Sequence, residues 1–171
     1  KLQDKEDQQK GTGKINNCNA RIIEKVLHQL KNEMSSNNIN YDIGIITPYK
    51  AQMELLRSKL ALKKNFDGYE IDIGTVDSFQ GSDRDIIIYD CVRSGKVKQK
   101  AKIDFIAEEK RLNVSLSRAK LLLIIVGDMD FLYQAQVSDK NNPFKSIIEY
   151  IAQNKSSYTI IEEKSDGRKT K

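Results

Sequence analysis

The feature that most constrains the fold is the alternation of short apolar runs with longer segments of helical period. Four runs stand out: Ile43–Ile46, Ile71–Val76, Asp85–Val92 and Leu121–Gly127. Continuous apolar runs of this length are typical of strands buried on both faces of a parallel sheet. Most of the segments between them repeat apolar residues every three to four positions, as amphipathic helices do. The pattern therefore predicts an α/β domain with a mainly parallel sheet flanked by helices.

Capping residues mark where several helices begin. Asn16 is expected to cap a helix whose apolar face continues to Met34. A second helix is predicted over about residues 49–62, and a third over residues 108–118. The last helix is expected to begin at Asn142, which directly precedes a proline.

Composition divides the chain into three parts. Residues 1–14 are polar and contain Gly11 and Gly13, so we expect a flexible leading segment. Residues 15–162 carry the predicted strands and helices and are expected to form one domain. Residues 163–171 are polar, which favours a disordered tail.

Several classes of function are excluded by composition. The chain has one histidine and two cysteines, Cys18 and Cys91, without metal-ligand spacing, so no metal site is predicted. No apolar run reaches the roughly 20 residues of a membrane span, so no membrane partner is expected. The net charge of +5 permits a polyanionic partner without requiring one.

The run from Arg111 to Arg118 carries two arginines seven residues apart. In a helix this spacing is about two turns, so both guanidinium groups would project from one face. Arginine is permanently charged and can bind phosphate oxygens with two parallel hydrogen bonds. This helix is therefore a candidate phosphate-binding element. The alternative is a solvated helix face on which Glu108 pairs with Arg111.

The loop after the second predicted strand is rich in hydrogen-bonding groups. Thr75 and Ser78 are candidates for binding the phosphates of a nucleic acid, and Gln80 and Asp83 for orienting a water or binding a ribose hydroxyl. Ligands of parallel sheets bind beyond the carboxyl ends of the strands, and residues 47–49 and 77–81 are each expected to follow such an end. The alternative is a capped turn in which Asp77 and Ser78 bind their own backbone.

Acidic residues near the predicted strand ends offer a further alternative. The set consists of Asp77, Asp83, Asp85, Asp128 and Asp130. Carboxylates gathered at one edge can bind magnesium for nuclease or phosphatase chemistry. However, none of them repeats at a metal-ligand spacing.

Three segments, taken in order, resemble sequence motifs of superfamily 1B helicases. Residues 43–52 (IGIITPYKAQ) resemble motif IV, residues 75–81 (TVDSFQG) with 91–94 (CVRS) resemble motif V, and residues 111–120 (RLNVSLSRAK) resemble motif VI. The match is similar to the second, C-terminal RecA-like domain of the group that contains the nonsense-mediated-decay helicase and senataxin. The resemblance implies a three-layer RecA-like fold of the P-loop NTPase type.

The resemblance implies a role for each matching position. Arg118 matches the arginine finger, which reaches the γ-phosphate across the cleft from the first RecA-like domain, and Arg111 matches a second catalytic arginine of motif VI. The implied nucleotide-binding residues are Gln80, Gly81 and Asp83, the last at a position where the family usually has glutamate. The implied nucleic-acid-binding residues are Thr47, Tyr49, Thr75, Asp77 and Ser78.

The resemblance also implies cofactors and partners. ATP and Mg²⁺ would serve the full-length enzyme, held mainly by the first RecA-like domain, and the substrate would be single-stranded RNA or DNA. This sequence has no Walker A lysine and no Walker B pair, so the chain alone is expected to be inactive. It is also expected to be monomeric. Its expected location is the nucleus or the cytoplasm. The alternatives are a non-catalytic nucleic-acid-binding module with the same fold, and a metal-dependent nuclease.

Overall fold

A parallel sheet of four strands forms the centre of the molecule. The computed structural model describes residues 8–61, 69–95, 102–138 and 141–154, except residue 12. The strands lie in the order β4-β3-β5-β6, and every neighbouring pair is parallel. Their bounds are Ile43–Thr47 for β3, Ile71–Thr75 for β4, Arg84–Asp90 for β5 and Ala119–Val126 for β6. The predicted α/β fold with a parallel sheet is confirmed.

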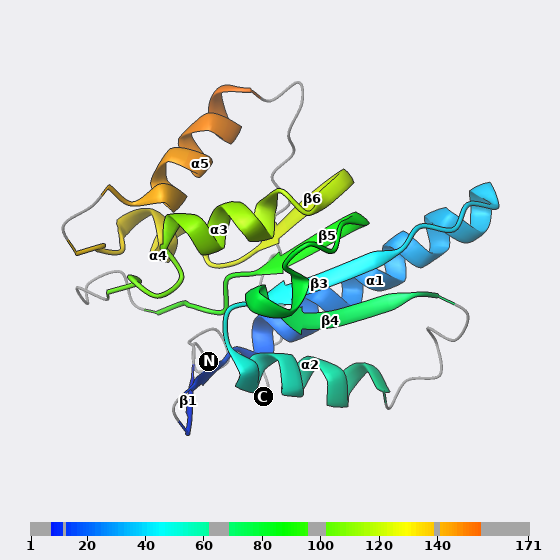
Figure 1. Cartoon of the computed structure of the whole chain (residues 1–171), viewed down its shortest axis with the longest axis horizontal. Helices are drawn as coiled ribbons and strands as arrows, with labels where there is room; N and C mark the ends of the chain where they lie inside the picture. The colour runs from blue at the N-terminus through cyan, green and yellow to red at the C-terminus, as the bar shows by residue number, and fades with distance from the viewer. Residues whose placement is uncertain (1–7, 12, 62–68, 96–101, 139–140, 155–171) are drawn as a thin grey trace, which may run out of the picture.

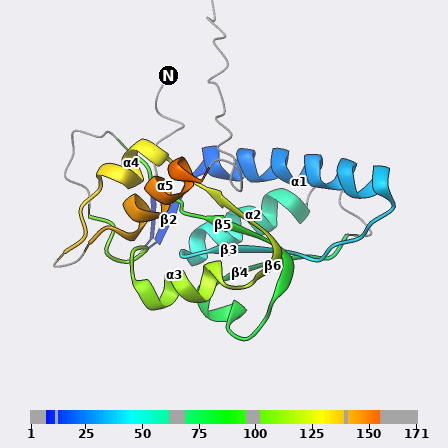
Figure 2. The ribbon, with the colours of Figure 1, turned by 90° about the horizontal axis from the view of Figure 1, so that it is seen from above.

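Helices cover both faces of this sheet (Figure 1, Figure 2). Their bounds are Asn17–Asn37 for α1, Lys50–Ala61 for α2, Val76–Phe79 for the 3-10 helix η3, Glu109–Leu116 for α3, Met129–Gln134 for α4 and Pro143–Gln153 for α5. Helices α1 and α2 pack on one face, and η3, α3, α4 and α5 lie on the other. The result is a three-layer domain. Within the described ranges, no helix is long and apolar enough to cross a bilayer.

Strand β5 shows why the apolar runs are continuous. Ile86 and Ile88 belong to the core beneath α1 and α2, whereas Ile87 and Tyr89 belong to the core beneath α3. Successive side chains of a strand point to opposite faces. Because helices bury both faces, the central residues 86–89 of this strand are all hydrophobic, and the alternation that marks a half-exposed strand is absent.

Two helices begin at the capping residues that the sequence predicted, and one helix ends earlier than predicted. The side chains of Asn16 and Asn142 cap α1 and α5, as predicted. Helix α3 ends at Leu116, whereas the sequence predicted that it would include Arg118. The reason is the sheet: the backbone oxygen of Arg118 accepts a hydrogen bond from Arg84 N at 3.0 Å, so residue 118 already belongs to the approach to β6.

Part of the leading segment forms regular structure. Residues Gln8–Lys10 (β1) and Gly13–Ile15 (β2) form a short antiparallel hairpin. Gly11 has a φ of +59°, which serves the tight turn, and Gly13 lies against Ala51 of α2. The two glycines therefore form a turn with close backbone packing. Residues 1–7 and the predicted tail 163–171 lie outside the described residues.

The connection from β4 to β5 is unusually short. Residues 76–83 lead from the carboxyl end of β4 to the amino end of β5, although β3 lies between these strands. Crossovers between parallel strands usually need a dozen or more residues. This one lies directly on the sheet, because Gly44 and Gly74 leave room for the ring of Phe79. A Cβ atom at these positions would lie 2.7 Å and 2.8 Å from that ring.

A buried polar network fixes the carboxyl end of β5 against the starts of α1 and α2. Asp90 accepts hydrogen bonds from Asn19 Nδ2 (2.7 Å), Gln52 Nε2 (2.7 Å) and Val92 N (2.9 Å). Asn16 Nδ2 donates to Val92 O at 2.8 Å. Val92 has a φ of +61°, which is strained for a β-branched residue and is held by these bonds.

Replacing Gly44 by alanine is expected to destabilise the domain by about 1–3 kcal/mol, because the new methyl group would overlap Phe79 and Ile87. Gly95→Ala is the matched control, since its methyl group would make only an ordinary 3.4 Å contact with Phe131. Urea unfolding of both variants measures the difference. Equal stabilities would show that the crossover does not lie against the sheet.

Stability is expected to fall as the pH rises from about 4 to about 7 because of Asp90. Burial raises the pKa of Asp90 to about 6, although the hydrogen bonds from Asn19, Gln52 and Val92 oppose this shift. In the unfolded chain the carboxyl of Asp90 has its ordinary pKa near 4, about two pH units below its pKa in the folded protein. Once the pH exceeds both values, ionisation has lowered the free energy of unfolding by an amount on the order of 3 kcal/mol.

Asp90→Asn has no proton to lose and tests this expectation. The unfolding free energy of the wild type minus that of Asp90→Asn should fall by about 3 kcal/mol as the pH rises through this window. A difference that stays constant with pH would contradict the raised pKa.

Candidate functional site

The candidate residues lie at two opposite edges of the sheet. Thr47 and Thr75 are register partners that end β3 and β4 at the carboxyl edge. Asp83 and Arg118 directly precede β5 and β6, at the amino edge. The sequence predicted residues 77–81 beyond the carboxyl end of β4, whereas Asp83 of the same connection lies at the amino edge. The crossover explains the difference, because it starts at one edge and finishes at the other.

At the amino edge, Arg118 is bound by the carboxylate of Asp83. Arg118 Nη1 donates to Asp83 Oδ1 at 2.8 Å, and its Nε donates to Val114 O at 3.1 Å. The side chain of Arg118 is 23% exposed and that of Asp83 is 52% exposed. Ion pairs this open to solvent contribute only about 0–1 kcal/mol. The guanidinium is therefore held in place by a partner that another anion can replace at low cost.

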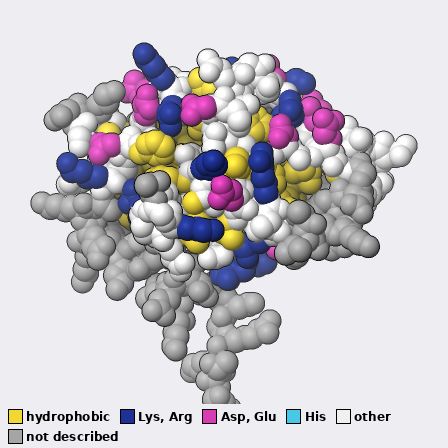
Figure 3. Space-filling view, turned by 60° about the horizontal axis from the view of Figure 1, so that its bottom comes forward, with side chains coloured by type: hydrophobic (Ala, Val, Ile, Leu, Met, Phe, Trp, Pro, Cys, Tyr) yellow, Lys and Arg dark blue, Asp and Glu magenta, His cyan; other side chains and the backbone are white. Residues whose placement is uncertain are grey.

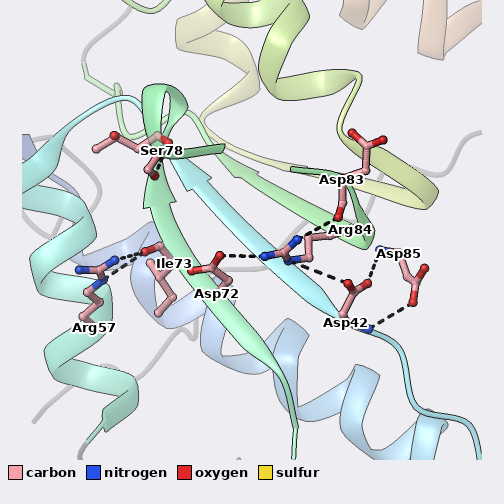
Figure 4. A network of polar contacts seen from close by, with 9 residues as sticks. Asp42, Arg57, Asp72, Ile73, Ser78, Asp83, Arg84 and Asp85 are labelled. Atoms are coloured by element: carbon pink, nitrogen blue, oxygen red, sulfur yellow. Dashed lines mark hydrogen bonds and ion pairs between the residues drawn. The ribbon is translucent and has the colours of Figure 1, made fainter. Parts of the chain in front are cut away.

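Arg84 braces the end of the crossover, as Figure 4 shows. Its Nη2 lies 3.0 Å from Asp72 Oδ2, its Nη1 donates to Asp83 O at 3.0 Å, and its Nε lies 3.9 Å from Asp42 Oδ2. The guanidinium also lies 5.8 Å from the centre of the Phe79 ring. Sequence reasoning missed this residue, and the only signal was an arginine between two aspartates at a strand start.

At the carboxyl edge, Arg111 joins α3 to the start of the crossover. Its Nη2 lies 3.4 Å from Asp77 Oδ2, and its Nε lies 3.3 Å from Glu108 Oε2. The pairing with Glu108 is the one that the sequence analysis gave as its alternative. The two arginines were expected on one face of a single helix. Instead, the helix ends before Arg118, and each guanidinium binds a different carboxylate of the crossover.

Several predicted residues have their side chains engaged or buried. Thr47 is fully buried, and its hydroxyl has no hydrogen-bond partner, so neither its side chain nor its backbone is open to solvent. Ser78 Oγ donates to Thr75 O at 2.8 Å, which is the locally satisfied turn given as the alternative. Gln80 and Gly81 are exposed, and Gly81 has a φ of +82° with open space around it. These two residues offer accessible backbone on the crossover.

The acidic residues do not assemble into a metal centre. Among the residues that the structure describes, no group of three or more His, Cys, Asp or Glu side chains could hold a metal ion. Asp128 instead caps α4 by accepting from Phe131 N at 3.1 Å. Asp85 lies 3.7 Å from Lys120 Nζ. Both carboxylates thus have structural partners, and the geometry gives the metal-dependent nuclease no support.

One face of the molecule carries charges of both signs. Figure 3 shows a face on which Lys and Arg side chains alternate with Asp and Glu instead of forming a patch of one sign. The net charge of +5 is therefore not concentrated on this face. Any anionic ligand has to be recognised by particular residues, because no broad positive field covers this side.

Comparison with known proteins adds to this geometry. Residues 1–130 match a protein family described as AAA domain. The chain is 39% identical over 115 residues to Helicase sen1 of Schizosaccharomyces pombe and 36% identical over 143 residues to Regulator of nonsense transcripts 1 of Dictyostelium discoideum. It is 41% identical over 87 residues to DNA polymerase alpha-associated DNA helicase A of Schizosaccharomyces pombe.

These alignments cover 66%, 82% and 51% of this chain but only 7%, 10% and 12% of the three relatives. The chain thus spans about a tenth of the length of these relatives. The family match covers well over half of the chain and includes all three motif segments. The chain therefore belongs to the AAA domain family of superfamily 1B helicases.

Proposed function

We propose that the chain is the second, C-terminal RecA-like domain of an ATP-dependent DNA or RNA helicase. The observation that supports this role most directly is the position of Arg118. Its guanidinium lies at the surface, in a fixed turn, bound to one half-exposed carboxylate. An arginine finger needs this combination, because it has to exchange its resting partner for a phosphate when two domains close.

The residues of this chain fit a nucleotide better than they fit a metal ion. Arg118 supplies a cation for the γ-phosphate, and Gln80 and Gly81 supply exposed groups on the same crossover that carries Asp83. Bound ATP would supply the phosphoryl group whose transfer to water drives the motor. Because the described residues offer no carboxylate cluster, Mg²⁺ would be held mainly by the first RecA-like domain.

The carboxyl edge is proposed to bind the single strand. The hydroxyl of Ser78 is engaged, so its contribution would come from its backbone, whereas the fully buried Thr47 would support the edge without touching the strand. Tyr49, Thr75 and Asp77 remain at least partly exposed. Contacts of this kind reach phosphate and sugar groups, so they position a strand without reading its sequence. The crossover would then couple the two sites, because it links Asp77 at one edge with Asp83 at the other.

The chain alone is expected to hydrolyse ATP no faster than buffer, because its sequence has no Walker A lysine and no Walker B pair. Release of phosphate from Mg-ATP, measured with and without a single-stranded oligonucleotide, tests this. Sustained turnover by the purified chain would show that the site is complete without a second domain.

Arg118→Ala is expected to lower kcat by about 10³–10⁵-fold in a protein that joins this chain to a first RecA-like domain with intact Walker motifs. Arg118→Lys should lose most of this activity as well, because an ammonium group cannot bind two phosphate oxygens in parallel. Arg21→Ala, which removes an exposed arginine from α1, is the matched control.

The same Arg118 variants should leave the fold intact. The Arg118–Asp83 pair is partly solvated, so its loss should change the free energy of unfolding by only about 1 kcal/mol or less. Unimpaired kcat in a folded Arg118→Ala protein would refute the arginine-finger role. A chain that binds single strands but never gains ATPase activity from a competent first domain would favour the non-catalytic module.

A further inference from the structure

Phe105 is an exposed aromatic residue in a tightly held turn. Ile103 and Ile106 are 1% and 2% exposed, whereas Phe105 between them is 47% exposed. Ile106 N and Ala107 N both donate to Ile103 O at 3.0 Å, which closes the turn. Because both isoleucines are anchored in the core, the phenylalanine ring is held at the surface.

Two neighbours extend the surface of this ring. The Tyr49 ring lies 5.2 Å from Phe105 between centroids, with the planes inclined at 35°. The Arg111 guanidinium lies 5.2 Å from the centre of the Phe105 ring. A single exposed phenylalanine is ordinary on a protein surface. Two aromatic rings beside a guanidinium, however, make a π-rich surface of the kind on which nucleic-acid bases stack.

The charges around this surface suit a phosphate backbone. Lys102 is exposed, and Arg93 Nη1 donates to the backbone oxygen of Lys102 at 2.9 Å, so the Arg93 guanidinium lies beside residue 102. Of the nearby carboxylates, Asp104 is engaged by the backbone and hydroxyl groups of Ser138, and Glu108 is paired with Arg111. Arg111 also links Phe105 to Asp77, at the start of the crossover. The aromatic surface therefore adjoins the edge of the sheet that we propose for the single strand.

We infer that Phe105, supported by Tyr49 and Arg111, is a stacking platform for an unpaired base of single-stranded DNA or RNA. The inference rests on the proposed function and adds a residue that lies outside the three motifs. Stacking requires only the π-face that every base has, so the platform accepts any base. Its contribution is to hold one nucleotide in place while the neighbouring residues bind the backbone.

A tryptophan substitution gives a direct readout, because the chain contains no tryptophan. The fluorescence of Phe105→Trp should be quenched when oligothymidylate or oligouridylate is added, because the indole stacks on a base. Leu121→Trp is the matched control: Leu121 is 65% exposed, and it lies near the amino end of β6. Its fluorescence should not change with either oligonucleotide.

Binding affinity supplies a second readout. Phe105→Ala should weaken binding of a fluorescein-labelled single strand by about 5- to 100-fold, and Phe105→Leu nearly as much, whereas Phe105→Trp should keep it. The dependence of affinity on salt should stay the same in Phe105→Ala, because no phosphate contact is lost. Lys102→Ala should instead reduce that dependence.

The outcomes separate this inference from the proposed function. If the wild type binds single strands but Phe105→Ala binds equally well and Phe105→Trp is not quenched, the stacking platform is refuted and the proposed function stands. If the wild type binds no single strand at low salt, both fail. Thermal unfolding of each variant should match the wild type closely, since the Phe105 ring is half exposed.

Discussion

The path of the chain between β4 and β5 depends on two positions in the sheet that have no side chain. Gly44 and Gly74 leave a space into which the ring of Phe79 fits, so that eight residues suffice to cross from one edge of the sheet to the other. The rest of the candidate site depends on this contact. The crossover presents Asp77 to Arg111 at one edge and Asp83 to Arg118 at the other. A longer connection, lifted off the sheet, would not place both carboxylates.

Interactions of two different strengths support the domain and its site. The Asp90 network is buried and joins a strand end to the starts of two helices, so it resists rearrangement. The ion pairs of Arg111 and Arg118 are partly exposed and weak. This division suits a domain whose scaffold has to stay rigid while its charged groups exchange partners. It also explains why pH should act on stability through Asp90, which is far more deeply buried than the paired arginines.

Sequence reasoning found the elements more reliably than their ends. The apolar runs identified all four strands of the sheet, because a strand buried on both faces leaves a continuous pattern. The end of α3 was missed because the backbone oxygen of Arg118 accepts a hydrogen bond from Arg84 N at the start of β5. No local sequence pattern reveals this pairing. Phe105 and Arg84 were missed for a related reason: their importance comes from neighbours distant in the chain. Thr47 was predicted to bind nucleic acid, but it is fully buried, and its burial depends on packing that the sequence does not show.

What the sequence determined alone is the class of fold and the family, since the order of apolar runs and the three motif segments are local properties of the chain. The tertiary structure decided which charged groups meet. Arg111 and Arg118 are close in sequence, yet they bind carboxylates at opposite edges of the sheet. The physical reason is that a pairing between side chains depends on distance in space, and the crossover sets that distance through contacts between residues far apart in the sequence.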